Sequence, residues 1–246
     1  MTTIAVLCAM GSEIDELALR LHTHAVGAPS GLRIQIAEKN GVRVILCVCG
    51  EGKTNAALGT EAVILRYAPD ALLFTGVAGG IAEDLKAGNL VVADSFVQHD
   101  YDISALGYKP GYIVNLDTVV LTPDAELSAA LLRAAQVCSG DAHSARTGRF
   151  ATGDCFVGDA GSASRIREMF GADCVDMESA AFAQVCWLNG CRFAALRAVS
   201  DNGDGTAFRN FREFLTFAVG RTVDTVEAFL REIAPALFGI SSEELR

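Results

Sequence analysis

Short apolar segments alternate with amphipathic segments along most of this chain. Runs rich in apolar and β-branched residues lie at 3–9, 42–49, 71–76, 89–98, 145–153 and 192–200. Helical patterns follow many of them, and strands that alternate with helices build a largely parallel sheet. We therefore predict an α/β fold, with a mixed, mostly parallel, twisted central sheet that is flanked by helices on both faces.

One pair of runs gives a different signal. Alternating apolar segments stand on either side of Asn40-Gly41, and Asn-Gly is a strong indicator of a tight β-hairpin. Part of the sheet is therefore expected to be antiparallel. The chain of 246 residues contains no repeat and no linker, so we expect a single domain over 1–246. The longest irregular segment, 99–120, is expected to serve function or an interface.

Composition excludes several classes of protein. Although 51% of the residues are hydrophobic, no apolar run approaches the roughly 20 residues that cross a bilayer, and the N-terminus reads as a core strand, not a signal peptide. The formal charge of −10 argues against a nucleic-acid partner. The 8 cysteines are scattered, without C-x-x-C or histidine clusters. We expect a cytoplasmic protein with free thiols, no membrane contact, no metal and no cofactor.

Acidic residues recur just beyond the ends of the expected strands, where open α/β sheets bind ligands. They are Glu13, Glu51, Asp154, Glu178 and Asp201. A glycine turn at 79–80 and an aromatic side chain are expected at the same edge. Each acid alone has an ordinary explanation as a helix cap or turn former. Caps need not gather at one edge, however, and carboxylates without basic partners raise one another's pKa, which suits acid–base chemistry.

Four motifs carry a resemblance to a known family: FTGVAGGI (74–81), TGDCFVGD (152–159), VDMESAA (175–181) and LRAVSD (196–201). Together they resemble the purine nucleoside phosphorylase and nucleosidase superfamily, and most closely the methylthioadenosine/S-adenosylhomocysteine nucleosidases. The resemblance covers essentially the whole chain. It implies a three-layer sandwich, a homodimer, and a role in methionine salvage. It also implies hydrolysis of the N-glycosidic bond of 5′-substituted adenine nucleosides, which releases adenine and a 5-thioribose derivative.

The resemblance assigns the catalytic roles to acids at these motifs. Asp201 corresponds to the general acid that protonates N7 of adenine. Glu13 corresponds to the base that holds and deprotonates the attacking water. Glu178 corresponds to the residue that binds the ribose hydroxyls, and Asp176, where the family usually has Glu, is read as supporting or capping.

The binding positions follow from the same motifs. Met177 would lie under the sugar, Phe156 would stack on adenine, and the backbone of Val157 would read the base edge. Arg197 would orient Glu13 or the water, and Ser200 would orient Asp201. The other positions that the resemblance places in the site are Met10, Ala78 and Gly79, the tail-pocket residues Ile103, Leu106 and Tyr108, and the capping aromatic Phe211.

These assignments also make chemical sense. Breaking the C1′–N9 bond forms an oxocarbenium-like sugar and places negative charge on the base. The reaction therefore needs an acid at the base and a positioned water at the anomeric carbon. We expect burial to raise the pKa of Asp201 and keep it protonated near neutral pH.

Two positions depart from the family's pattern. Val77 stands where the family commonly has Ser, and phosphorylases use a polar residue there, with arginines, to bind phosphate. Water is therefore the expected nucleophile. Glu51 stands where an aliphatic residue usually lines the alkylthio pocket. Our hypothesis is that it pairs with the ammonium group of a homocysteine tail; the alternative is that it turns to solvent or pairs with Lys53.

Several functions remain open on the sequence alone. They are a nucleoside phosphorylase, a hydrolase of another 5′-modified nucleoside of the futalosine type, and a non-catalytic nucleoside-binding protein. The acids at 13, 178 and 201 favour an enzyme over a binder. A dehydrogenase is excluded, because GVAGG is not G-x-G-x-x-G and no acidic residue follows it at the expected distance.

Overall fold

The computed structural model describes residues 1–39, 41–140, 144–201 and 207–239. The expected apolar runs form strands: β1 (Thr2–Cys8), β4 (Val42–Val48), β5 (Ala71–Gly80), β6 (Leu90–Gln98), β7 (Ala145–Thr152) and β9 (Phe193–Asp201). The remaining strands are β2 (His24–Val26), β3 (Arg33–Lys39) and β8 (Cys174–Asp176). The helices are α1 (Asp15–Arg20), α2 (Lys53–Tyr67), α3 (Ala125–Ser139), α4 (Ala160–Phe170), α5 (Ser179–Leu188), α6 (Ala207–Ala228) and α7 (Ala234–Leu237).

The strands form one mixed sheet in the order β2-β3-β4-β1-β5-β8-β7-β6-β9. Strand β1 runs parallel to β4 and β5, and β5 runs parallel to β9. The expected hairpin is confirmed, because β3 pairs antiparallel with β4 and Lys39 lies opposite Val42. Because β9 pairs with both β5 and β6, one end of the sheet closes into a ring. The predicted α/β architecture with a mixed central sheet is confirmed.

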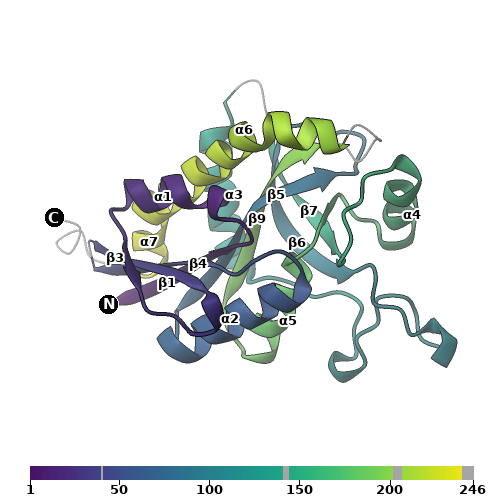
Figure 1. Ribbon diagram of the computed structural model, residues 1–246, viewed down its shortest axis with the longest axis horizontal. Coiled ribbons are helices and arrows are strands. Elements are labelled where there is room, and N and C mark those ends of the chain that lie inside the picture. The colour runs from purple at the N-terminus through teal and green to yellow at the C-terminus, as the bar shows by residue number, and fades with distance from the viewer. Residues whose placement is uncertain (40, 141–143, 202–206, 240–246) are drawn as a thin grey trace.

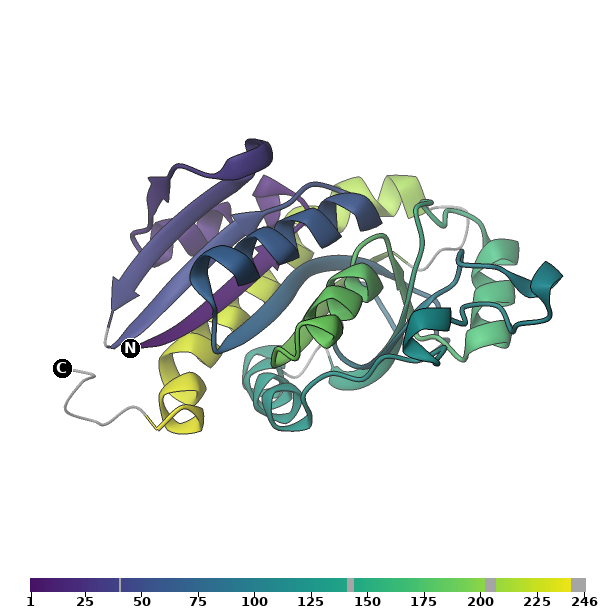
Figure 2. The same cartoon turned by 90° about the horizontal axis from the view of Figure 1, so that it is seen from below.

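Helices cover both faces of the sheet. In Figure 1, α1 and α6 lie on one side of the strands and α2 and α5 lie on the other. Figure 2 shows α2 and α5 side by side on the face of the sheet that they cover. The sheet and the two helical layers produce the three-layer arrangement.

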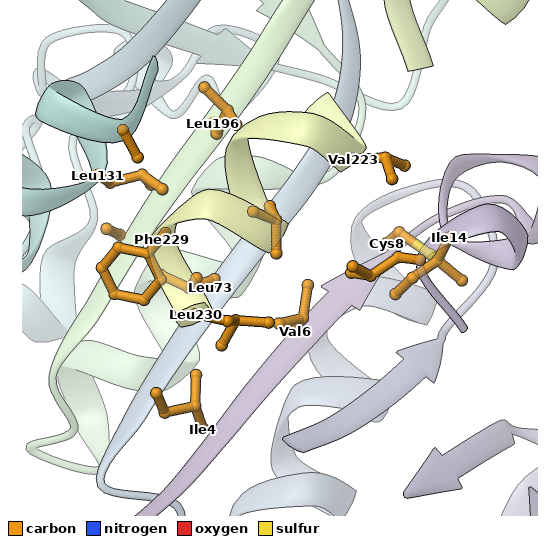
Figure 3. Packing of buried hydrophobic residues seen from close by; sticks show 14 of the residues in the cluster. Ile4, Val6, Cys8, Ile14, Leu73, Leu131, Leu196, Val223, Phe229 and Leu230 are labelled. Carbon is orange, nitrogen blue, oxygen red and sulfur yellow. The ribbon is translucent and has the colours of Figure 1, made fainter. Parts of the chain in front are cut away.

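Strand β1 shows why the buried strands read as continuous apolar runs. Ile4, Val6 and Cys8 point into the core beneath α6, where Figure 3 shows them near Val223, Phe229 and Leu230. Ala5 and Leu7 point into the opposite core, beneath α2 and α5. These five residues of β1 are all 0% exposed, as expected for a strand covered on both faces.

The segment 99–120 has little regular structure, as its sequence predicts. It contains short 3₁₀ turns at Ser104–Leu106 and Val114–Leu116 and an isolated bridge between Ile113 and Thr118. The loops extend from the body of the molecule below α4 in Figure 1. Among the residues that the structure describes, no helix is long and apolar enough to cross a membrane.

The expected glycine turn at 79–80 was wrong. Strand β5 continues through Gly80, and Gly79 and Gly80 pair with Val175 and Cys174 of β8. The same end of β5 also pairs with β9. Ladder hydrogen bonds on both sides therefore keep these glycines extended, and their role is to save space beside the neighbouring strands.

Candidate active site

A cavity of about 350 Å³ opens beyond the carboxyl ends of β1, β5 and β9. It is lined by Ala9, Met10, Glu13, Glu51, Val77, Ala78, Gly79, Phe156, Val175, Asp176, Met177, Glu178, Ser200 and Asp201. Most of the site residues expected from the sequence thus meet at one place. Parallel strands bring this about, because their carboxyl ends lie at the same edge of the sheet.

Glu13 is anchored by the backbone on both sides of the cavity. It ends the 3₁₀ turn that follows β1, and its side chain is buried with the residue 2% exposed. One carboxylate oxygen accepts the N–H groups of Ala9 (3.1 Å) and Met10 (2.9 Å), and the other accepts that of Val77 (3.1 Å). Burial raises the pKa of Glu13, although Arg197 and these N–H groups oppose the shift. Glu13 is therefore a fixed acceptor that can take up a proton.

Gly76 and Gly79 make room for functional side chains of the neighbouring strand. In the register of β5 and β9, Gly76 lies beside Arg197 and Gly79 beside Asp201. Gly76 has a φ of +148°, and a Cβ there would lie 2.3 Å from Glu13 Oε1 and 2.4 Å from Arg197 Nη1. No side chain fits between these two groups, so glycine at 76 is a requirement of the site.

The substitution Gly76→Ala is expected to damage both stability and activity. The methyl group must displace Glu13 or Arg197, and overpacking of this kind costs about 1–3 kcal/mol in the free energy of unfolding. Thermal unfolding and the rate of substrate turnover would measure the two effects. Gly220→Ala in α6 is the matched control: nothing lies within 4 Å of the added methyl group, so this variant should be as stable as the parent or more so. A Gly76→Ala protein with the parent's melting temperature and rate would contradict the steric explanation.

A buried arginine joins the carboxylates at the start of α5. Arg197 is 1% exposed; its Nη2 lies 2.8 Å from Asp176 Oδ2 and 3.2 Å from Glu178 Oε2. The ring of Phe74 packs against the guanidinium at 4.9 Å. We expected the carboxylates at this edge to lack basic partners, and that was wrong for Glu178. The contact could not be anticipated because Arg197 belongs to β9 and the acids flank the end of β8.

Among these carboxylates, Glu178 is the one whose pKa lies near neutral pH. Its other oxygen accepts the N–H of Gly52 at 2.8 Å. Burial raises its pKa to about 7, Arg197 lowers it, and Asp176 raises it. Although Glu178 directly precedes α5, Asp176 is the acid that accepts the first N–H of the helix, from Ser179.

Asp201 is the last residue of β9. It lies beside Gly79 of β5, whose other neighbour is β8. It is 3% exposed, and Ser200 Oγ lies 2.8 Å from its Oδ2. Ser200 also lies 3.3 Å from the carbonyl of Ala78, so its hydroxyl is held between the two strands. The expected contact between Ser200 and Asp201 is present.

A smaller recess adjoins the main cavity. It measures about 40 Å³ and is lined by Gly79, Cys155, Phe156, Val157, Val175, Asp176, Met177 and Asp201. Asp201 and Asp176 line both spaces, whereas Glu13 and Glu178 line only the larger one, and the carboxylate of Asp176 is paired with Arg197. Phe156 is 53% exposed at the border between them. A planar base could therefore lie beside Phe156 and Asp201 while its sugar faces the two glutamates.

Glu51 lies on the cavity wall, exposed, between Gly50 and Gly52, whose φ values are +97° and +90°. Asn55 Nδ2 donates a 2.7 Å hydrogen bond to its carbonyl and fixes the backbone. Lys53 pairs with Asp100 at 2.6 Å instead. The suggested pairing of Glu51 with Lys53 is therefore not made.

Some expected site residues lie elsewhere. Ile103, Leu106 and Tyr108 are on the 99–120 segment and do not line the described cavity; Leu106 is 76% exposed and Tyr108 41%. The side chain of Phe211 lies outside the described residues. Arg197 lies behind the wall, not in it. Within the described part of the chain, no group of His, Cys, Asp or Glu side chains is arranged to hold a metal ion.

Several residues of the site were not expected from the sequence. Ala9 and Val175 line the cavity, and Thr152 and Ser179 bind the carboxylate of Asp176. Ser179 had a usable signal, because an acid three residues before a serine at a helix start is a capping pattern. Thr152 had none, since it reaches Asp176 only through the pairing of β7 with β8.

The fold and the cavity define a protein of the nucleoside phosphorylase type, and residues 3–231 match the phosphorylase superfamily. A 5′-methylthioadenosine/S-adenosylhomocysteine nucleosidase of Geobacillus thermodenitrificans is 35% identical over 227 residues, which are 92% of this chain and 95% of that protein. The chain therefore belongs to this superfamily and, within it, to the 5′-methylthioadenosine/S-adenosylhomocysteine nucleosidases, which are N-glycosidic hydrolases. The resemblance drawn from the motifs is confirmed.

Solved structures agree with this assignment. The nucleosidase of the same name from Neisseria meningitidis, in complex with methylthio-immucillin-A, gives a TM-score of 0.87 at 33% identity, covering 94% of this chain and 99% of that one. Futalosine hydrolase of Helicobacter pylori gives a TM-score of 0.89 at 28% identity, covering 94% of this chain and 98% of that one.

Proposed function

We propose that this enzyme hydrolyses the N-glycosidic bond of adenine nucleosides with a 5′-thio substituent, S-adenosylhomocysteine and methylthioadenosine. The products are adenine and the corresponding 5-thioribose derivative. The observation that carries the proposal is the distribution of the acids: Asp201 faces the recess beside Phe156, while Glu13 and Glu178 face only the larger cavity. This separation supplies an acid for the base and carboxylates for the sugar.

The proposed mechanism gives the three acids different roles. Asp201 donates a proton to N7 of adenine as the C1′–N9 bond breaks, so the base leaves neutral. The carboxylates of Glu178 and Glu13 stabilise the positive charge that develops on the sugar. Glu178 accepts hydrogen bonds from the ribose hydroxyls, and Met177 supports the sugar. Water then adds to C1′ and passes a proton to Glu13.

Water is favoured over phosphate as the nucleophile. The lining residues that the structure describes include no lysine or arginine, and Arg197 is engaged by two carboxylates. Val77 contributes no hydroxyl, and its N–H donates to Glu13. A phosphate dianion would meet several carboxylates in this cavity without a cation to balance it.

Adenine release from methylthioadenosine, S-adenosylhomocysteine and adenosine, with and without phosphate, tests the proposal. Equal release under both conditions is expected. Release that requires phosphate would make the protein a phosphorylase. A folded protein that releases no adenine would support a nucleoside-binding protein or a hydrolase of another 5′-modified nucleoside; the similarity to futalosine hydrolase keeps the latter as the second candidate.

The side chain of Glu51 is proposed to favour a cationic tail. Glu51→Ile is expected to lower the ratio of kcat/KM for S-adenosylhomocysteine over methylthioadenosine by about two- to five-fold, the size of an exposed ion pair. Glu51→Gln is the matched control, because it removes the charge and keeps the shape. Both variants should shift the ratio in the same direction. A ratio that stays unchanged in both variants would show that Glu51 faces solvent without a role.

A homodimer is also proposed. The 99–120 segment, which carries Ile103, Leu106 and Tyr108, extends from the body of the molecule in Figure 1. Leu106 and Tyr108 are exposed. In the family that the sequence resembles, this region meets a second subunit and completes the tail pocket. Cytoplasmic location and a role in methionine salvage remain predictions.

A further inference from the structure

Asp176 lies at the centre of a buried network that the proposed mechanism does not use. It is the last residue of β8 and is 9% exposed. Its carboxylate accepts hydrogen bonds from the hydroxyls of Thr152 and Ser179 and from Arg197 Nε at 3.0 Å, and it forms an ion pair with Arg197 Nη2 at 2.8 Å. Each of these partners is a donor. The network is therefore built for a carboxylate at this position.

Arg197 is shared unequally between its acidic neighbours. Asp176 contacts two of its nitrogens, whereas Glu178 contacts one of them at 3.2 Å. Ser179 Oγ also lies 3.1 Å from Nη2 and 3.2 Å from Nε, on the side of Asp176. The third edge of the guanidinium, at Nη1, lies 3.4 Å from the carbonyl of Thr75. Most of the positive charge thus faces Asp176.

The charged groups around Glu178 do not balance. Arg197 of β9 is the cation beside it, while Asp176 of β8 and Glu13 after β1 bring negative charge. The thiol of Cys49, which directly follows β4, lies near enough that Glu178 helps burial to raise its pKa, and Asp201 lines the same cavity as Glu178. One buried guanidinium cannot neutralise Asp176, Glu178 and Glu13 together.

We propose that Asp176 is a positioning residue, which holds Arg197 away from full contact with Glu178 and so sets the pH below which Glu178 stops binding the ribose hydroxyls. The inference rests on the proposed function, since it assumes a ribose at Glu178. Asp176 does not touch the substrate in this role. It acts through the guanidinium.

The sign of the effect follows from the charges. Burial raises the pKa of Glu178 to about 7, and Asp176 adds to that rise. Glu178 is ionised above this pH and accepts hydrogen bonds from the ribose with both oxygens; below it, one oxygen carries a proton, and the neutral acid is the weaker acceptor. The kcat/KM profile of the wild type should therefore fall as pH drops through about 7. Without the charge of Asp176, this acid limb should move to lower pH.

The experiment is the pH profile of kcat/KM for adenine release by the wild type, Asp176→Asn and Asp176→Glu. The Asn variant is expected to lose plateau activity and to move its acid limb down by about one pH unit, the scale of one nearby like charge. For each protein, kcat/KM at pH 6 can be expressed as a fraction of its plateau value. This fraction should be about five-fold larger for Asp176→Asn than for the wild type. The Glu variant retains the carboxylate and should restore the position of the limb.

Ser179→Ala separates charge from packing. It removes a buried hydroxyl from the same network but no charge, so its limb should stay with that of the wild type. Equal shifts in Asp176→Asn and Ser179→Ala, or no shift in Asp176→Asn, would overturn the proposal. If Asp176→Asn does not fold, Glu178→Gln replaces it: only the ionisation of Glu13 then remains to shape the limb, so the limb should move, and a limb identical to that of the wild type would overturn the proposal. A wild type that releases no adenine would instead refute the proposed function.

Discussion

Replacing Asp201 with Asn is expected to lower kcat for adenine release by about 10²–10⁴-fold, with little change in KM. Asn has nearly the shape of Asp and can still accept a hydrogen bond from Ser200, which lies 2.8 Å from Asp201 in the wild type. It can also donate a hydrogen bond to N7 of the base. It cannot transfer a proton, so the base must leave as an anion.

A substrate with a better leaving group makes this test specific. A 4-nitrophenyl riboside releases a stabilised phenolate that needs no proton. Asp201→Asn should therefore cleave it almost as well as the wild type does. Equal losses on the adenine nucleoside and on the nitrophenyl riboside would indicate damage to the site, and Asp201 would no longer be assigned as the general acid.

Replacing Glu13 with Gln is expected to lower kcat by a similar factor of about 10²–10⁴, for a different reason. Both carboxylate oxygens of Glu13 accept backbone N–H groups, from Ala9 and Met10 on one side and from Val77 on the other. The NH₂ group of Gln would have to face one of these donors. The variant thus loses the base and leaves a buried donor unpaired, which costs about 1–3 kcal/mol in the free energy of unfolding.

Azide distinguishes the chemical loss from the structural one. It is a nucleophile that needs no base, so it should restore substrate consumption by Glu13→Gln and form the glycosyl azide. It should not restore Asp201→Asn, in which departure of the base is the slow step. A Glu13→Gln protein with the activity of the wild type would exclude Glu13 as the base. Melting temperatures of both variants would report the stability difference.

The elements and the acids of this protein could be predicted because their signals are local. Apolar β-branched runs indicated the long strands, and Asn-Gly indicated the turn between β3 and β4. The site edge followed from a general rule about parallel strands, so Glu13, Glu178 and Asp201 could be placed in one cavity before the fold was known. The position of Glu51 at the cavity could be anticipated in the same way.

Only the tertiary structure decided which residues contact these acids. Gly76 must be glycine because the register of β5 and β9 sets it beside Arg197 and the path of the chain brings Glu13 to the same point. Arg197 binds Asp176 and Glu178 because β9 and β8 both flank β5. Such contacts join residues far apart in the chain, and nothing in the local pattern of either partner encodes them. The sequence by itself indicated which acids gather at the cavity, and the strand pairing decided how charge is divided among them.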